Sequence, residues 1–200
     1  MFASDNCNIH LKLFIMKTRP LNFVVLFLIL LIYLKPVYTQ DNTSTCQHTP
    51  IEVKEIDAQK SLVIKADVPM SAIGEKMGEL YGKLFAFIGE KGIQPAGPAF
   101  AIYYSWEPEG NVVFEAGVPV VSEVEGSGEI VYKEFPVMKT VTTLYSGAYE
   151  TMEPVYTQLQ KYMEENKLES TGCSWEVYLT DPQMVKNPED NKTLIYFPLK

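Results

Sequence analysis

Arginine and histidine are nearly missing from this 200-residue sequence. Arg19 is the only arginine, and His10 and His48 are the only histidines. The part of the chain that follows Thr39 carries 13 lysines against 24 acidic side chains, which makes it strongly negative. Guanidinium groups are the side chains best suited to clamp phosphates and to read guanine edges. An acidic chain without them argues against a nucleic-acid partner.

Motifs for catalysis and metal binding are equally scarce. His48 is the only histidine after residue 39, which argues against Ser–His catalysis and histidine metal clusters. There is no glycine-rich phosphate loop, and the acidic run 122–129 is more typical of a solvated linker than of a calcium site. Cys46 and Cys173 could form one disulfide in an oxidising compartment, or stay free as small apolar groups. The sequence therefore predicts no metal site.

Residues 1–39 have the pattern of an export signal. Phe23–Leu34 is an unbroken apolar run, preceded by the basic segment 16–19. A membrane span needs about 20 such residues, so this shorter run fits a signal-peptide core better. We expect translation to start at Met16, residues 1–15 to come from an over-extended gene prediction, and the mature chain to begin near Gln40. The alternative is an uncleaved signal anchor.

This signal predicts a periplasmic or secreted protein, or one tethered to the membrane by the anchor. Contact with a membrane is expected only through that anchor. Residues 40–50 (QDNTSTCQHTP) are small and polar and end in proline, so they are predicted to be a flexible tether. The 46% hydrophobic content indicates a globular body, which we place at residues 51–200.

The body contains an internal repeat with a shift of 75 residues, which places position 77 on position 152 and position 103 on position 178. After a four-residue insertion, positions 118–120 fall on positions 197–199. Apolar and aromatic residues agree in class and spacing between units of about 51–121 and 129–200. The matched positions include Met77 with Met152, Tyr81 with Tyr156, Phe100 with Trp175 and Tyr103 with Tyr178. We therefore predict a tandem duplication of one supersecondary unit.

Each unit is predicted to be a βαββ element. A β-rich run (61–68 and 137–144) precedes an amphipathic helix, whose apolar positions recur every three or four residues between 73 and 88 and between 149 and 163. Two strands follow (99–106 and 111–120; 174–180 and 193–199), and 51–56 and 130–135 add an edge strand each. Joined edge to edge, the units give an α+β domain with one antiparallel sheet and two helices on one face.

Small details of the helices also lead to predictions. Ser71 and Ser146 are candidate N-caps, and Gly92 is a candidate C-terminal stop. Gly74, Gly78 and Gly82 recur every four residues on the first helix. This spacing predicts close packing of the helix backbone against a neighbour, at some cost in helix propensity.

Strand 174–180 has two different faces. Trp175, Val177 and Leu179 are apolar and are predicted to face the helices. Glu176 and Tyr178 then face the opposite side, where we expect a cleft between the repeats with Tyr103 as the partner of Tyr178. A carboxylate flanked by tyrosines suits an organic cation, because the carboxylate attracts the charge and each ring face adds a cation–π interaction. Such an interaction is worth about 2 kcal/mol or more per ring when desolvated. The alternative is an exposed strand glutamate beside an amphipathic tyrosine.

The sequence resembles the GyrI-like small-molecule-binding family over residues 50–200. The resemblance rests on PAGPAFAIYYSW (95–106), VVFEAGVPV (112–120), residues 144–172, WEVYLTDP (175–182) and IYFPL (195–199). The family includes effector-binding domains of multidrug-sensing regulators. The resemblance implies a duplicated βαββ fold and an aromatic cleft whose central glutamate accepts lipophilic, cationic aromatic compounds. It implies that this glutamate is Glu176 and that Tyr103, Tyr178 and Tyr196 form the aromatic wall.

Three functions remain open on this basis. The first is an exported module that binds a small organic ligand, cationic or amphiphilic. The second, implied by relatives that resemble hydrolases of cyclopropane toxins, is a hydrolase with Glu176 as general base; no catalytic residue is assured. The third is a protein-interaction module. Because the sequence has an export signal and no helix-turn-helix module, we do not expect transcription control or gyrase inhibition. A related fold binds haem, but the cleft lacks a histidine for axial ligation, so no cofactor is expected.

Overall fold

The computed structural model describes residues 47–106, 110–181 and 184–200, which belong to one compact unit, Ser44–Lys200. The predicted export signal at 1–39 and the first part of the predicted tether, residues 40–46, lie outside the described residues. Within the described ranges, no helix is both long enough and apolar enough to span a membrane.

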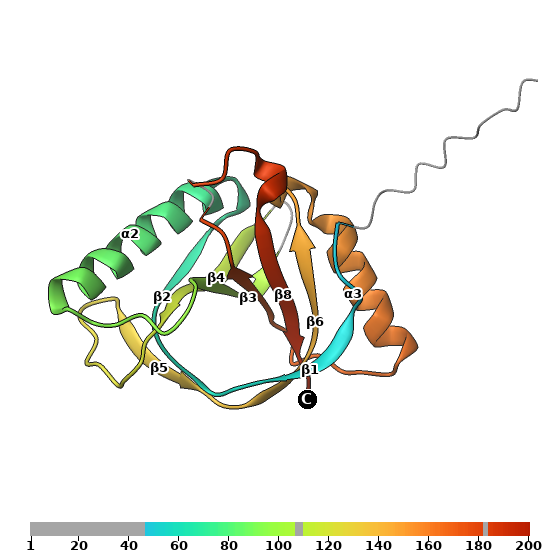
Figure 1. The fold of residues 1–200 in the computed structure, drawn as a ribbon, viewed down its shortest axis with the longest axis horizontal. Coiled ribbons are helices and arrows are strands. Elements are labelled where there is room, and N and C mark those ends of the chain that lie inside the picture. Colours follow the sequence, from blue (N-terminus) through green and yellow to red (C-terminus); the bar gives the residue numbers. More distant parts are fainter. Residues whose placement is uncertain (1–46, 107–109, 182–183) are drawn as a thin grey trace, which may run out of the picture. The chain divides into compact units, whose positions relative to one another are not determined.

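The chain folds into an eight-stranded antiparallel sheet with two helices, so the predicted α+β architecture is confirmed (Figure 1). The elements are β1 (Glu52–Ile56), β2 (Gln59–Pro69), a 3₁₀ turn (Met70–Ala72), α2 (Ile73–Lys91), β3 (Phe100–Trp106), β4 (Asn111–Pro119), β5 (Val131–Phe135), β6 (Met138–Ser146), a 3₁₀ turn (Tyr149–Thr151), α3 (Glu153–Glu165), β7 (Ser174–Tyr178), a 3₁₀ turn (Pro188–Asp190) and β8 (Lys192–Pro198).

The strand order shows the duplication directly. The sheet runs β1-β6-β8-β7-β3-β4-β2-β5, so β3 and β7 meet at the centre and each half repeats the other in reverse. The edge strands are exchanged: β1 pairs with β6 of the second repeat, and β5 pairs with β2 of the first. This exchange connects the two repeats at both edges as well as at the centre.

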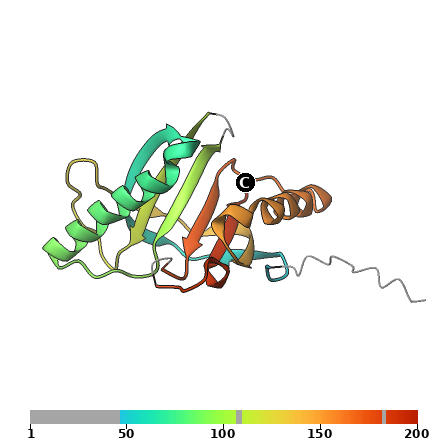
Figure 2. The same cartoon turned by 90° about the horizontal axis from the view of Figure 1, so that it is seen from above.

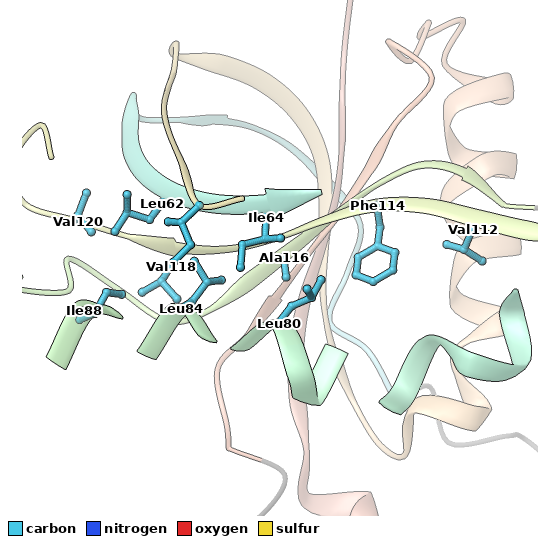
Figure 3. Close-up of a cluster of buried hydrophobic side chains, with 11 residues drawn as sticks. Leu62, Ile64, Leu80, Leu84, Ile88, Val112, Phe114, Ala116, Val118 and Val120 are labelled. Atoms are coloured by element: carbon cyan, nitrogen blue, oxygen red, sulfur yellow. The ribbon is translucent and has the colours of Figure 1, made fainter. Parts of the chain in front are cut away.

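Each helix covers its own half of one sheet face. Helix α2 packs on β2 and β4, and α3 packs on β6, at opposite ends of the sheet (Figure 1). Leu80, Leu84 and Ile88 of α2 lie over the apolar side chains of β2 and β4, as Figure 3 shows. Full burial of a leucine stabilises the fold by roughly 1.5–3 kcal/mol. This packing holds the two helices apart, over the outer strands.

The opposite face of the sheet is a second core, which corrects the prediction for strand 174–180. The rings of Trp175 and Phe100 stack at 5.1 Å, Tyr196 stacks on Trp175 at 5.6 Å, and Phe135 meets Trp175 edge-on at 4.8 Å. The sheet curls, and β5 brings Phe135 onto this face. Trp175 and Val177 therefore belong to a core away from the helices, and Glu176 lies on the helix side.

Several local predictions also need correction. Ser71 lies inside a 3₁₀ turn, and the N-cap of α2 is Ala72, with no side-chain cap hydrogen bond. Ser146 ends β6 rather than starting α3. The last part of the predicted tether is ordered against β6, because the amide of Thr49 donates to the carbonyl of Leu144. Gly92 ends α2 with φ of 64°, as expected for a left-handed C-terminal glycine.

Candidate ligand-binding site

A cavity of about 1020 Å³ lies on the helix face of the central strands. It is lined by residues of α2, of β3 and β7, and of the segment from Tyr149 to Tyr156. Figure 2 shows β3 and β7 running between the two helices. Residues of both repeats line the cavity, which lies on the helix face of the sheet rather than on the opposite face that the sequence predicted. Its size falls in the range of small-molecule pockets.

Glu176 lies on the wall of this cavity and accepts hydrogen bonds from three tyrosines. Tyr156 donates to Oε1 at 2.5 Å, while Tyr178 and Tyr103 donate to Oε2 at 2.9 and 3.3 Å. The hydroxyls of Tyr103 and Tyr178 are 3.1 Å apart. The side chain is buried, with the residue 8% exposed. The alternative of an exposed strand glutamate is therefore wrong.

The sheet register explains why these groups converge. Glu176 of β7 lies opposite Ala101 of β3, and the methyl group of the alanine leaves space above it. Tyr178 and Tyr103, two residues further along their strands, point to the same face. Tyr156 reaches the carboxylate from α3. The site therefore depends on both repeats, although the carboxylate comes from one.

Burial dominates the electrostatics of this cluster. Removal from water raises the pKa of Glu176 above its ordinary 4.5, and the hydrogen bonds from Tyr156, Tyr178 and Tyr103 oppose that rise. Burial together with the nearby carboxylate holds the pKa of all three tyrosines well above 10. The tyrosines are therefore neutral hydroxyl donors at physiological pH. Within this cluster, Glu176 is the group whose protonation state can change with pH.

The cavity wall is mostly apolar and aromatic, and its charged groups are acidic. Met77, Tyr81 and Phe85 of α2 contribute apolar surface, and Tyr149 meets Tyr178 edge-on at 5.8 Å. The carboxylates lining the cavity besides Glu176 are Glu150, Glu153 and Asp181. Among the described residues, the lining contains no lysine or arginine. The cavity thus combines aromatic faces with negative charge.

The structure brings together three of the four residues predicted for the site. Glu176, Tyr103 and Tyr178 all line the cavity. Tyr196 does not: it lies opposite Trp175 in the register, on the other face of the sheet, and is 2% exposed. The prediction for Tyr196 is wrong because an aromatic residue on a central strand can belong to either of two cores.

Sequence reasoning missed three tyrosines of the cavity: Tyr81, Tyr149 and Tyr156. The repeat contained the signal for two of them, since Tyr81 and Tyr156 occupy matched positions of the two units. Tyr81 and Tyr149 were assigned to the buried helix stripes, and Tyr156 was recognised only as the counterpart of Tyr81. In the structure, Tyr81 and Tyr156 pack with the buried apolar clusters and also line the cavity. Tyr81 donates to the carbonyl of Phe100 at 2.7 Å.

The predictions for metals and for the cysteines concern other parts of the chain. Within the part that the structure describes, no group of three or more His, Cys, Asp or Glu residues is placed to hold a metal ion. Cys173 is a free, half-buried thiol, and Cys46 lies outside the described residues. In the acidic run 122–129, Glu129 pairs with Lys83 at 2.6 Å.

Comparison with known proteins gives one family match. The model of the GyrI-like small molecule binding domain matches residues 49–200. A comparison with curated proteins found no match.

Solved structures share the fold at low identity. The C-terminal domain of EcmrR is 23% identical, with a TM-score of 0.63, over 76% of this chain and 97% of that domain. In the EcmrR–DNA complex, this chain spans 59% of the length of EcmrR. A hydrolase from Listeria innocua is 14% identical, with a TM-score of 0.56, over 75% of this chain and 91% of the hydrolase. SAV2435 bound to tetraphenylphosphonium is 10% identical, with a TM-score of 0.52, over 76% of this chain and 94% of SAV2435. These similarities establish the fold alone.

Proposed function

Because the chain belongs to the GyrI-like small-molecule-binding family, we propose that it binds a lipophilic aromatic cation in the cavity between α2 and α3, with Glu176 as the charge partner. One observation carries the proposal. Glu176 is buried, and its three hydrogen-bond partners are neutral hydroxyls. A buried carboxylate without a cation is costly. A ligand that brings a positive charge supplies the missing partner.

The surrounding side chains favour the same kind of ligand. Tyr81, Tyr149 and Tyr178 present rings to the cavity, and a desolvated cation over such a ring gains about 2 kcal/mol or more. The further carboxylates of the lining attract cations and repel anions. The structure of SAV2435 with tetraphenylphosphonium supports this choice, since that cation occupies a protein of the same fold.

Two ions of the same shape and opposite charge test the proposal. We expect tetraphenylphosphonium to bind the full chain and tetraphenylborate not to bind. Glu176→Gln should weaken the binding of the cation at least tenfold, which corresponds to about 1.4 kcal/mol. The matched control is Glu115→Gln. Glu115 is also a buried strand glutamate, but it pairs with Lys133 and lies on the other face of the sheet, opposite Ile102.

Isothermal titration calorimetry measures the affinity of the wild type and both variants for the two ions. Loss of affinity in Glu176→Gln alone supports the proposal. Equal binding of the cation by all three proteins overturns the role of Glu176, and binding of neither ion by the wild type overturns the cation proposal. If the chain instead binds a basic protein, and Glu176→Gln leaves that binding unchanged, the function of a protein-interaction module is favoured.

Hydrolysis of an electrophilic small molecule is the second candidate. It is favoured by the raised pKa of Glu176, because a carboxylate with a raised pKa is a better general base. The Listeria innocua neighbour named as a hydrolase supports it. The test is the turnover of strained or ester substrates across pH. Turnover that survives in Glu176→Ala excludes this mechanism.

Export of the protein is a separate part of the proposal. It rests on the basic, apolar and small-residue zones of residues 16–39. An exported member would meet its ligand outside the cytoplasm, in the periplasm or medium, or at the membrane surface if the signal stays attached. Cell fractionation distinguishes these locations, and a purely cytoplasmic protein would contradict the proposal.

A further inference from the structure

Three oxygen atoms of the site form a closed triangle of hydrogen-bond contacts. Oε2 of Glu176 lies 2.9 Å from the hydroxyl of Tyr178 and 3.3 Å from the hydroxyl of Tyr103. The two hydroxyls are themselves 3.1 Å apart. The second carboxylate oxygen, Oε1, is outside the triangle and accepts from Tyr156. The triangle therefore has three contacts, and each of them needs a hydrogen atom of its own.

The number of hydrogens in the triangle depends on the protonation of Glu176. A tyrosine hydroxyl carries one hydrogen, and an ionised carboxylate carries none. With Glu176 ionised, the two tyrosine hydrogens serve three contacts, so two of the oxygens face each other without a hydrogen between them. With Glu176 protonated on Oε2, three hydrogens serve three contacts and close a ring. The oxygen geometry thus matches the neutral acid better than the carboxylate.

The other titratable groups of the cavity lining also favour the neutral acid. They are Tyr81 of α2, Tyr103 of β3, Tyr149 and Glu150 of the 3₁₀ turn before α3, Glu153 and Tyr156 of α3, Tyr178 of β7, and Asp181. Burial, followed by the charge of Glu176, raises the pKa of Tyr81 and Tyr149, as it does for the other three tyrosines. The three further carboxylates are exposed, and their negative charge disfavours a second charge on Glu176. Among the described residues, no lysine or arginine lines the cavity to stabilise the ionised form.

We propose that a proton and an organic cation compete for Glu176: the ligand-free site holds a proton on Oε2, and binding of the cation releases it. This inference rests on the proposed function and adds its regulation, because such a site binds cations at neutral pH and releases them on acidification. The cation favours the ionised carboxylate, since an opposite charge stabilises it. By linkage, the proton weakens the binding of the cation by the same factor.

Calorimetry of the full chain with tetraphenylphosphonium measures the released proton. Titrations at the same pH in phosphate and in Tris, whose heats of ionisation differ, give the number of protons released per cation. We expect about one proton at mildly acidic pH and a fall towards zero at alkaline pH. The Kd should rise about tenfold for each pH unit below the pKa of Glu176 in the ligand-free protein. The matched control, Glu115→Gln, should release as many protons as the wild type.

Infrared difference spectroscopy provides a second measurement, which does not require Glu176→Gln to bind the cation. The spectrum of the ligand-free wild type minus that of ligand-free Glu176→Gln, at mildly acidic pH, should contain the C=O band of a protonated carboxyl. This band should disappear from the wild type when tetraphenylphosphonium is added. Circular dichroism verifies that the variant is folded.

The outcomes separate this inference from the proposed function. Proton release in the wild type, with the infrared band assigned to Glu176, supports the inference. Binding of tetraphenylphosphonium with a constant Kd across pH and no proton release overturns the inference and leaves the proposed function intact. Proton release that persists in Glu176→Gln overturns the assignment to Glu176. If the wild type binds the cation at no pH, both the inference and the proposed function are wrong.

Discussion

Tyr156 donates its hydroxyl hydrogen to Oε1 of Glu176 across 2.5 Å and so connects helix α3 to the central strand β7. Its counterpart in the first repeat, Tyr81, donates instead to the backbone carbonyl of Phe100. The difference follows from the strands below, since Ala101 of β3 occupies the position that corresponds to Glu176. The duplicated fold provides a cavity from both repeats, and the second repeat alone provides the buried carboxylate.

Removing the hydroxyl of Tyr156 should weaken cation binding. In Tyr156→Phe the ionised carboxylate loses a hydrogen bond, so the pKa of Glu176 rises further. A hydrogen bond to a charged group is worth about 1.5–3 kcal/mol, and we expect at least a tenfold loss of tetraphenylphosphonium affinity at neutral pH. Tyr81→Phe is the matched control, and calorimetry at pH 7 compares the two. Equal losses in both variants would contradict the role of the Tyr156–Glu176 bond.

The stability of the empty protein should depend on the protonation of Glu176. Its folded pKa lies above the ordinary 4.5, so the unfolded state releases this proton first as the pH rises. The free energy of unfolding therefore falls from about pH 4.5 up to the raised folded pKa. Glu176→Gln should remove this part of the fall, leaving the variant more stable than wild type at neutral pH. Urea denaturation between pH 4 and 8 measures it, and parallel curves for both proteins would refute the assignment.

Two tyrosines on opposite faces of the sheet should respond differently to loss of the hydroxyl. Tyr178 donates to Oε2 of Glu176 and lines the cavity, so Tyr178→Phe should lower tetraphenylphosphonium affinity several-fold. Tyr196 stacks on Trp175 in the second core, so Tyr196→Phe should leave affinity unchanged. Titration of both variants is the measurement. A weaker affinity in Tyr196→Phe would show that the second core affects the cavity.

Most of the fold could be predicted because the repeat specifies it twice. A helix stripe or strand that is ambiguous in one unit is supported by its counterpart in the other, as Leu84 is by Leu159. The exchange of β1 and β5 between the repeats could not be foreseen. Both edge strands are short and contain no fully buried residue, so their sequence patterns do not specify a partner.

The sequence placed the candidate site on the wrong face of the sheet, although Glu176, Tyr103 and Tyr178 do line one cavity. Alternation correctly separated Glu176 from Trp175, but it cannot tell which face the helices cover when both faces are buried. The second core, made when the sheet curls and Phe135 packs on Trp175, has no local signal in the strand. The close packing predicted for Gly74, Gly78 and Gly82 is wrong for a related reason. A Cβ added at any of them meets no atom within 4 Å, and spacing alone does not distinguish a close contact from an open wall.

Two glycines should respond in opposite ways to alanine. A Cβ at Gly117 would lie 2.3 Å from the ring of Phe100, so Gly117→Ala should destabilise the protein by roughly 1–3 kcal/mol through overpacking. A Cβ at Gly78 meets open space, and alanine favours the helix by about 1 kcal/mol, so Gly78→Ala should stabilise it. Thermal unfolding of both variants shows whether each substitution lowers or raises the stability of the protein. A destabilised Gly78→Ala would mean that this glycine has a structural role.

The last prediction concerns the N-terminus of the native protein, which we expect near Gln40. The apolar run 23–34 and the basic segment before it have the order that signal peptidase substrates require. Cleavage there retains the segment 47–49, whose backbone pairs with β6 through Thr49 and Leu144, so the processed chain keeps the edge of its sheet intact. N-terminal sequencing of protein from the native host measures the start directly. A chain that begins at Met1 or Met16 in the cytoplasm would contradict export and restore intracellular drug sensing as the role of the cavity.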